Sequence, residues 1–464
     1  MSRTLCLVSL LLGLASASPA PAAETLPPIP QPKLAKTYDQ SELPPPGPIL
    51  VRAQNSPAIY GLYVWTGEYA KHRSDIKSVG WRSFRVGGPF DDAAMRMFVE
   101  DGVDVIKTTG SNGKSGPKPD ADPAGDEAFI RAHIAGVTGM IRRYGNQGTF
   151  FKENPGLPHR PIRMIEAWNE PNFQYLIKPD QRPQAEQEAD REALFAKLQP
   201  AAYKAAKALD PDIVYGGFAT GGSSAGDLRF VENVHRRNPA VARSYDVFST
   251  HPYVNAVPPE CYSVHKWGRY SIASSLAILR KTMAGYGRTD VPVWYTEIGW
   301  EISKTDGGKY ERPKETITPE LQAAYTCRMY AYSLRLGVER VTNMFATDTD
   351  NYNGGFFKDD GTWRPSAYAV QTMIRLMPSP RLEEIVSDGT GGTFAYRFSP
   401  RAGAGKASVI MLWNVAGPRT VEVPVAAPKV SVVGMTGDTR EAKPAGGLLK
   451  VDIGPLPVYL VIEG

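Results

Sequence analysis

Two segments of the chain each run from a largely apolar stretch into a glutamate. Residues 162–168 lead into an Asn-Glu-Pro sequence whose acid is Glu170, and residues 291–296 lead directly into Glu297. A proline at such a point ends a strand. A carboxyl group at the end of a buried strand lies where burial or a neighbouring charge shifts its pKa. Paired carboxyl groups of this kind are typical of acid–base and nucleophilic chemistry.

Two other acidic residues compete with this pair. Glu166 lies inside the first segment, so we interpret it as an interior or structural residue. Glu301 lies beyond the second segment, in a predicted loop. Glu170 and Glu297 are therefore the preferred candidates.

Eight short apolar runs alternate with helical segments, which predicts a β/α architecture with a parallel sheet. The predicted strands are 59–65, 83–86, 103–107, 162–168, 213–217, 247–250, 293–297 and 341–345. The predicted helices are 91–101, 126–145, 185–209, 227–237, 271–285, 319–336 and 366–377. This count predicts an α/β fold, a (β/α)8 TIM barrel with insertions. A doubly wound open sheet is the competing architecture.

In such a barrel the C-terminal strand ends line the mouth. Glu170 would end the fourth strand and Glu297 the seventh, roughly across the barrel from each other. Opposed strand ends can hold two carboxyl groups at ~5–5.5 Å, the separation used in double-displacement chemistry.

The remaining sequence divides into three parts. Residues 1–23 read as a signal peptide, with Arg3 before a short apolar core and small residues after it, so we expect an exported protein, periplasmic or secreted. Residues 24–48 form a proline-rich leader, expected to be extended or to lie on the surface as a strap, and the barrel is expected to span residues 49–379. Residues 380–464 are predicted to form a small C-terminal antiparallel β-sandwich domain, with strands at 393–398, 408–413, 420–425, 430–433, 448–453 and 458–462.

Composition excludes several classes of function. The net charge of +5 is spread along the chain without a lysine or arginine run, which argues against nucleic acid binding. No segment after the signal approaches the ~20 apolar residues of a transmembrane helix. Cys261 and Cys327 are expected either to form one bridge or to remain separate buried thiols, and neither has the spacing of a metal site.

The two glutamate segments at these barrel positions resemble the clan of retaining (β/α)8 glycoside hydrolases. Within that clan the chain looks most similar to family 39 and to family-39-like endoglycosidases of bacterial exopolysaccharide loci. The resemblance covers about residues 57–379 and the β-rich tail. It implies that Glu170 is the acid/base and Glu297 the nucleophile, with no cofactor and no metal.

The resemblance also implies roles for four neighbours. Asn169 would hydrogen-bond the sugar 2-hydroxyl, and Arg85 would keep Glu297 ionised, although an ordinary buried ion pair is the alternative for Arg85. His251 and Tyr253 would orient the nucleophile and contact the sugar, or His251 would be a satisfied polar residue at a strand end.

Aromatic residues near the predicted strand ends are candidate sugar-stacking walls. The preferred contact is Trp300, with Trp168 and Trp65 as further walls. The other candidates are Phe90, Phe173, Tyr175, Trp267, Tyr310 and Tyr352. Lys107 is expected to bind a sugar hydroxyl or carboxylate, or to pair with a neighbouring acid.

The expected function is retaining cleavage of β-glycosidic bonds in a polysaccharide or oligosaccharide by a monomer. Three alternatives stay open: an exo-acting xylosidase, iduronidase or arabinosidase, a transglycosylase, and a non-catalytic polysaccharide-binding protein. The C-terminal β domain would give structural support or bind carbohydrate.

Overall fold

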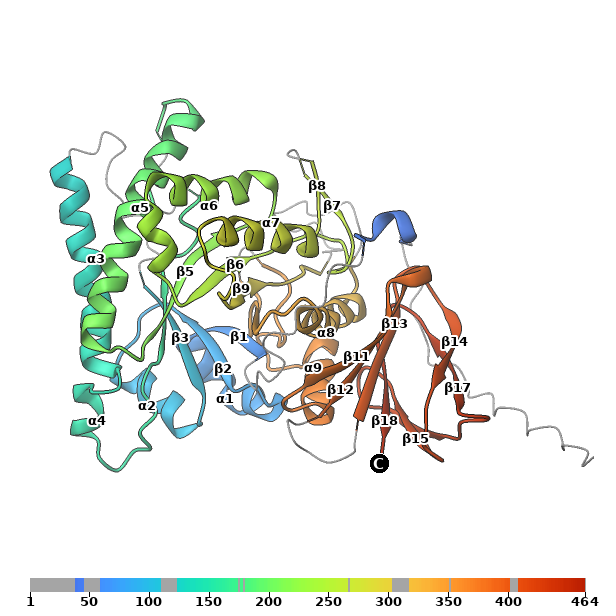
Figure 1. The fold of residues 1–464 in the computed structure, drawn as a ribbon. Helices are drawn as coiled ribbons and strands as arrows, with labels where there is room; N and C mark the ends of the chain where they lie inside the picture. The colour runs from blue at the N-terminus through green and yellow to red at the C-terminus, as the bar shows by residue number, and fades with distance from the viewer. Residues whose placement is uncertain are drawn as a thin grey trace, which may run out of the picture.

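Eight parallel strands close into a barrel in the computed structural model (Figure 1). The structure describes residues 38–45, 59–109, 123–173, 176–177, 180–265, 268–302, 317–349, 352–400 and 408–463. The barrel order is β1-β10-β9-β6-β5-β4-β3-β2. The strands are β1 (Tyr60–Trp65), β2 (Ser83–Gly87), β3 (Asp104–Thr109), β4 (Met164–Ala167), β5 (Val214–Gly221), β6 (Val247–His251), β9 (Val293–Ile298) and β10 (Arg340–Asn343). Pairing of β1 with β10 closes the sheet, so the open-sheet alternative is wrong.

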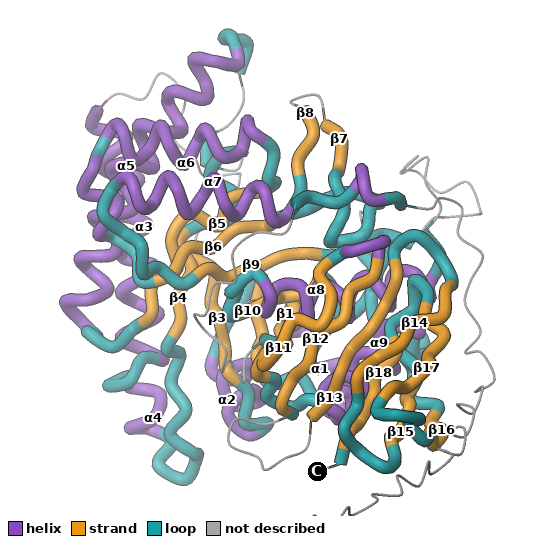
Figure 2. The backbone as a smooth tube through the Cα atoms, turned by 45° about the vertical axis from the view of Figure 1, so that its right-hand side comes forward, coloured by secondary structure: helices purple, strands orange, loops and turns teal. Residues whose placement is uncertain are grey.

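Helices surround this barrel, as the tube in Figure 2 shows. They are α1 (Thr66–Val79), α2 (Asp92–Glu100), α3 (Pro123–Tyr144), α4 (Thr149–Glu153), α5 (Gln184–Leu209), α6 (Ala225–Arg237), α7 (Ile272–Gly285), α8 (Pro319–Arg335) and α9 (Pro365–Leu376), with a 3-10 turn η2 (Pro239–Arg243). Within the described ranges, no helix combines the length and the apolar character needed to cross a bilayer.

Strand register determines which side chains face the barrel interior. Thr108 pairs with Glu166 and Val86 pairs with Lys107. Since side chains alternate along a strand and partners in register point the same way, Arg85, Thr108 and Glu166 face inward. Val86 and Lys107 face outward, toward the helices.

Side chains fill the barrel near the N-terminal ends of its strands. Ile106, Met164, Val247 and Trp294 form a buried apolar cluster there. Arg340 stacks over Trp294, with its guanidinium 4.7 Å from the ring centre. The interior is therefore packed, with Arg340 bonded to Ser83 near the N-terminal strand ends, and the acidic groups Glu166 and Glu297 lie toward the C-terminal ends.

The C-terminal residues form a β-sandwich beside the barrel, shown in orange to red in Figure 1. One sheet has the order β11-β12-β13-β18-β15-β16, and β14 pairs with β17 in a second sheet. The strands are β11 (Arg381–Asp388), β12 (Thr393–Ser399), β13 (Ser408–Asn414), β14 (Arg419–Pro424), β15 (Val430–Val433), β16 (Thr439–Ala442), β17 (Leu448–Ile453) and β18 (Val458–Ile462), with a 3-10 turn η3 (Thr390–Gly392). Apolar side chains from both sheets, including Leu412, Leu460 and Val451, share one buried cluster.

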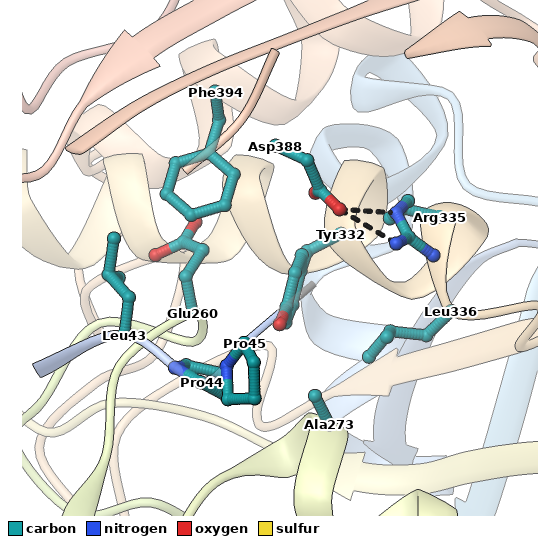
Figure 3. Close-up of a pocket in the computed structure, with 10 residues that line it drawn as sticks. All are labelled: Leu43, Pro44, Pro45, Glu260, Ala273, Tyr332, Arg335, Leu336, Asp388 and Phe394. Atoms are coloured by element: carbon teal, nitrogen blue, oxygen red, sulfur yellow. Dashed lines mark hydrogen bonds and ion pairs between the residues drawn. The ribbon is translucent and has the colours of Figure 1, made fainter. Parts of the chain in front are cut away.

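The barrel and the sandwich are joined by buried polar contacts. Arg328 of α8 donates to Glu260 at 3.0 Å and to the carbonyl oxygen of Pro455 at 3.2 Å. Arg335 donates to Asp388 of β11 at 2.7 Å. Figure 3 shows this second ion pair in a small pocket that also contains Tyr332 and Phe394. The sandwich is thus an integral support of the barrel.

Part of the proline-rich leader lies across this junction. Residues 38–45 contain a 3-10 turn, η1 (Gln40–Glu42). The N–H of Tyr38 donates to Val415 of the sandwich at 3.4 Å, and the carbonyl oxygen of Glu42 accepts from Tyr262 of the barrel at 2.8 Å. Pro44 and Pro45 line the pocket of Figure 3. These residues act as a strap, whereas residues 1–37 lie outside the described part.

Two features of the loops complete the fold. A hairpin, β7 (Ser263–His265) and β8 (Gly268–Tyr270), projects from the chain after β6. The described cysteines Cys261 and Cys327 are both buried, and they are separate thiols, which answers the alternative left open by the sequence.

Candidate active site

The turn after β4 presents Glu170 in an unusual backbone conformation. Trp168 has φ 64° and Glu170 has φ 48°, values that non-glycine residues adopt rarely and mostly at functional sites. Neighbouring strands hold this turn: Trp168 N–H donates to Thr109 and Glu170 N–H donates to Ala219, both at 2.9 Å. The fixed turn carries the Glu170 carboxyl to His251, on β6.

Glu297 lies on β9 and is 8 % exposed. Arg85 Nη1 donates to its Oε1, and the hydroxyl of Tyr253 donates to its Oε2 at 3.2 Å. Both oxygens of Glu297 are therefore bonded to donors, which hold the carboxyl group in one orientation. Arg85 lies beside Glu297, as the sequence predicts.

Arg85 also binds two further partners from β4 and its turn. Its Nε donates to Glu166 at 2.6 Å, and its Nη2 donates to the side-chain oxygen of Asn169 at 2.7 Å. Burial is the largest single influence and raises the pKa of Glu166, but the charge of Arg85, the charge of His251 and side-chain hydrogen bonds together lower it. Glu166 is therefore an ionised interior partner of Arg85, in keeping with its interpretation as an interior residue.

The two candidate catalytic carboxyl groups lie close together. An oxygen of Glu170, an oxygen of Glu297 and a ring nitrogen of His251 all lie within 4.8 Å of one another. His251 Nδ1 is 2.9 Å from Glu170 Oε1 and 3.5 Å from Glu297 Oε2. Carboxyl groups of retaining glycosidases lie ~5–5.5 Å apart, whereas inverting enzymes separate them by ~6.5–9.5 Å. The geometry fits the retaining class.

The protonation of these groups differs because their surroundings differ. Burial raises the pKa of Glu170 to about 7, against the opposing charge of Arg85. Burial lowers the pKa of His251 to about 4, so its ring is neutral and its Nδ1–H can donate to a carboxylate. Glu170 thus retains a proton near neutrality, as a general acid does.

Tyr253 is held from two sides. Burial raises the pKa of its hydroxyl well above the usual value, so it remains a donor to Glu297. Its hydroxyl also contacts the sulfur of Met344, and its carbonyl oxygen accepts from the Tyr270 hydroxyl at 3.0 Å. The projecting hairpin therefore supports Glu297 through Tyr253.

Trp65, at the end of β1, is half-buried at the inner side of the barrel mouth. Its ring centre lies 5.2 Å from that of Phe345 and 5.7 Å from that of Tyr63. Tyr63 lies beneath Arg85, whose guanidinium carbon is 5.0 Å from the ring centre. Gly87 is required beside them, because a Cβ there would lie 2.3 Å from the Tyr63 hydroxyl.

Three residues that were expected to contact substrate do not face the barrel mouth. Trp300 is 1 % exposed, donates from Nε1 to Val257 at 2.9 Å and packs against Tyr325, so no face of its ring is free for a sugar. Trp168 is 3 % exposed and packs against Phe129 and His133 of α3. Both are packing residues, contrary to expectation.

Lys107 is the third correction. Its side chain starts on the outer face of β3, and Nζ donates to the carbonyl oxygens of Val86 at 3.2 Å and Gly88 at 3.1 Å. Burial, then the charge of Arg85, lowers its pKa to about 8. Lys107 therefore satisfies backbone acceptors at the end of β2 and does not face the barrel interior.

Several residues of the site carry no signal in the sequence. Tyr63 and Thr108 contact charged groups, with Tyr63 beneath Arg85 and the Thr108 hydroxyl donating to Glu166 at 3.0 Å, and Met344 contacts the Tyr253 hydroxyl. Strand alternation around Arg85 and Glu166 indicates which neighbours face inward, but only register identifies Thr108. Tyr352, a further aromatic candidate, is 9 % exposed and bonds to Met344 backbone at 3.0 Å. Tyr175, Trp267 and Tyr310 lie outside the described residues.

The group of Glu170, His251 and Glu297 also has the spacing of a possible metal-ligand set. Arg85 and Tyr253 already occupy both oxygens of Glu297. A guanidinium bound to the same carboxylate would repel a cation. This donor arrangement fits acid and nucleophile roles better than metal binding.

The chain is similar to known proteins in structure, but not in sequence. Neither models of protein families nor curated proteins match the chain. A family 39 glycoside hydrolase from Bacteroides cellulosilyticus matches with a TM-score of 0.65 at 19% identity, covering 90% of this chain and 82% of its own. A monomeric β-xylosidase from Caulobacter crescentus matches with a TM-score of 0.56 at 15% identity, covering 89% and 98%. A bifunctional glucanase–xylanase from a metagenome library matches with a TM-score of 0.57 at 12% identity, covering 90% and 98%. At these identities the likeness establishes the shared fold.

Proposed function

We propose that the protein is a retaining glycoside hydrolase with Glu170 as acid/base and Glu297 as nucleophile. One observation carries the proposal: the two carboxyl groups have oxygens within 4.8 Å of each other but opposite electrostatic surroundings. Glu297 accepts from Arg85 and Tyr253, whereas burial keeps a proton on Glu170. The fold shared with family 39 and related enzymes supports the proposal of a glycoside hydrolase.

The first step forms a glycosyl–enzyme. A carboxylate oxygen of Glu297 attacks the anomeric carbon, and the bond from that carbon to the leaving oxygen breaks. The proton of Glu170 passes to the leaving oxygen, so the departing group leaves as a neutral alcohol and Glu170 becomes a carboxylate.

The second step releases the sugar. The Glu170 carboxylate takes a proton from water while the water oxygen attacks the anomeric carbon, and the ester bond to Glu297 breaks. Two displacements at one carbon return its original configuration. His251 contacts both carboxyl groups and Asn169 is oriented by Arg85, so both hold the reacting groups in place.

The substrate we propose is a β-linked polysaccharide or oligosaccharide, with a bacterial exopolysaccharide as the preferred source. The aromatic group at Trp65 supplies a wall on one side of the site. Phe173 is 39% exposed, and its ring and the Glu170 carboxyl both touch Gly221. Because Glu170 protonates the leaving oxygen, Phe173 lies on the side where a leaving sugar would stack.

The products separate the alternative activities. Oligosaccharides indicate internal cleavage, single sugars indicate an exo-acting glycosidase, and longer chains indicate transglycosylation. Absence of any product from a broad panel would favour a polysaccharide-binding protein. We further propose export through the N-terminal signal and a monomeric state, which sequencing of the secreted protein's N-terminus and light scattering would check.

Variants of the two glutamates test the proposal. Glu297→Gln is expected to lose more than about 10³-fold in kcat, because the nucleophile is absent. Glu170→Ala is expected to lose activity on poor leaving groups and to regain it with azide and an activated aryl glycoside. Glu127→Gln, on the exposed face of α3, is the matched control. Substantial hydrolysis by Glu297→Gln, with its fold intact by circular dichroism, would refute the assignment.

A further inference from the structure

One side-chain amide ties the loop after Glu170 to the end of β5. Asn172 Oδ1 accepts from the Gly221 N–H at 2.9 Å, and Asn172 Nδ2 donates to the Gly221 carbonyl oxygen at 2.8 Å. Asn172 is 9 % exposed, so water competes weakly for these bonds. The amide therefore fixes the distance between the two chain segments.

Gly221 is also the surface against which the Glu170 carboxyl rests. A Cβ on Gly221 would lie 2.7 Å from Glu170 Oε1 and 2.4 Å from the ring of Phe173. The N–H of Glu170 donates to Ala219, two residues earlier in β5, at 2.9 Å. The backbone that Asn172 holds is thus the backbone that locates the carboxyl group.

Asp227 extends this network from the N-terminus of α6. Its Oδ1 accepts from Asn172 Nδ2 at 3.2 Å, and its Oδ2 accepts from the N–H and hydroxyl of Ser224 at 2.9 and 2.7 Å. Gly222, with φ +81°, leaves room for Asp227, since a Cβ there would lie 2.4 Å from Oδ2. A negative charge is therefore anchored close to Glu170.

We propose that Asn172 and Asp227 are positioning residues for Glu170: Asn172 holds the carboxyl against Gly221, and Asp227 supplies a charge that favours the protonated form. The inference rests on the proposed role of Glu170 as acid/base. Burial is the main cause of the raised pKa of Glu170, Arg85 opposes it, and Asp227 and Glu166 add to it. The charged or titratable groups that face Glu170 are Arg85 from β2, Glu166 from β4, Asp227 from α6, His251 from β6, Tyr253 after β6, and Glu297 from β9.

A substrate-free titration tests both residues. In full-length protein with ¹³C-labelled glutamate carboxyl groups, the Glu170 signal, assigned with Glu170→Gln, is expected to titrate near pH 7. Asp227→Asn is expected to move this midpoint to lower pH because the repelling charge is gone. Asn172→Ala is expected to lower it as well, because the released carboxyl gains water.

The matched control for charge is Asp91→Asn at the start of α2, where the Asp91 side chain accepts from Ala94 N–H at 2.9 Å. This variant is expected to leave the Glu170 midpoint unchanged. An unchanged midpoint in Asp227→Asn would overturn the role of Asp227, and an unchanged midpoint in Asn172→Ala would overturn that of Asn172. The titration decides both cases whether or not hydrolysis is detected.

Leaving-group dependence provides the second readout. With aryl and alkyl β-xylosides and β-glucosides, Asn172→Ala is expected to lose about 10-fold or more in kcat/KM on poor leaving groups, and little on dinitrophenyl glycosides that need no acid. Asn238→Ala is the control, since Asn238 makes a similar two-sided amide contact at the far end of α6. An equal loss on all leaving groups would contradict the positioning role, whereas no hydrolysis by the unaltered protein would instead refute the proposed function.

Discussion

Arg85 connects most of the charged groups of the site through one guanidinium. It donates to Glu166, Glu297 and Asn169, and it is almost completely buried. Arginine suits this place because its planar fork binds several acceptors at once and stays charged when buried. One buried guanidinium thus helps to lower the pKa of Glu166 and orients Glu297, while burial raises the pKa of Glu170.

This charge distribution predicts the alkaline side of the pH profile. With a pKa of about 7, Glu170 is protonated below this pH and ionised above it. Since the acid form donates the proton, kcat/KM is expected to fall as pH rises through about 7. The measurement is the pH dependence of kcat/KM on an alkyl glycoside.

A substrate with an activated leaving group is the control for this profile. It needs no proton in the first step, so its kcat/KM is expected to stay level through the same range. A fall of equal size with both substrates would contradict the assignment of Glu170.

At the scale of the elements, the eight barrel strands and seven of the surrounding helices were predictable from the sequence. Short apolar runs between polar loops indicate buried strands without any knowledge of the fold. Helix α1 was missed because it buries few apolar side chains and has a non-helical residue, His72, in its middle. Strand β16 is short and largely exposed, and β11 is buried at one position only, so neither shows a clear pattern.

The residues of the site that lie at or near strand ends were predictable from the sequence. Positions at strand ends bring Glu170, Glu297, Arg85, His251 and Tyr253 together, and the structure places them so. The direction in which each side chain points, into the barrel or toward the helices, was harder to predict. Trp168 turns outward because its positive φ breaks the alternation of β4.

The predicted orientations of Trp300, in the loop after β9, and of Lys107, on β3, were wrong for a similar reason. Trp300 enters the core beside Tyr325, and nothing local to the sequence marks this. Lys107 points outward because it is in register with Val86. These orientations depend on tertiary packing and not on local pattern.

Trp65 lies at the barrel mouth, whereas Lys107 faces outward, and this difference gives a prediction at the scale of the elements. Trp65→Ala is expected to raise KM by about 10-fold or more, because it removes a stacking wall at the mouth. Lys107→Met is expected to change KM by less than about twofold, since its ammonium bonds to backbone on the outer face. Steady-state kinetics on one oligosaccharide compares them, and a larger KM effect for Lys107→Met would show that β3 is misplaced.

At the scale of the whole molecule, the barrel and the sandwich share one continuous core. Residues of β13 such as Met411 and Trp413 belong to the same buried cluster as the barrel. Arg328, fully buried, bonds to Glu260 and to the sandwich backbone. The two parts are therefore expected to unfold together.

Removal of this buried arginine tests the coupling. Arg328→Ala leaves Glu260 as an unpaired buried charge and is expected to lower the free energy of unfolding by about 3–5 kcal/mol. Urea denaturation followed by fluorescence and circular dichroism measures the change. Arg131→Ala, in an exposed pair with Glu127 on α3, is the control and is expected to cost less than about 1 kcal/mol.

The urea curves also show whether the two parts unfold together. A single transition in both proteins fits one cooperative unit. Two separate transitions in the unaltered protein would contradict the shared core.

The central claim concerns the stereochemistry of the reaction, which the spacing of Glu170 and Glu297 determines. Proton NMR of the anomeric signals, recorded as a β-glycoside is hydrolysed and before the product equilibrates, measures it directly. We predict that the β-anomer appears first, because two displacements restore the configuration. Appearance of the α-anomer first would contradict the double-displacement account and the nucleophilic role of Glu297.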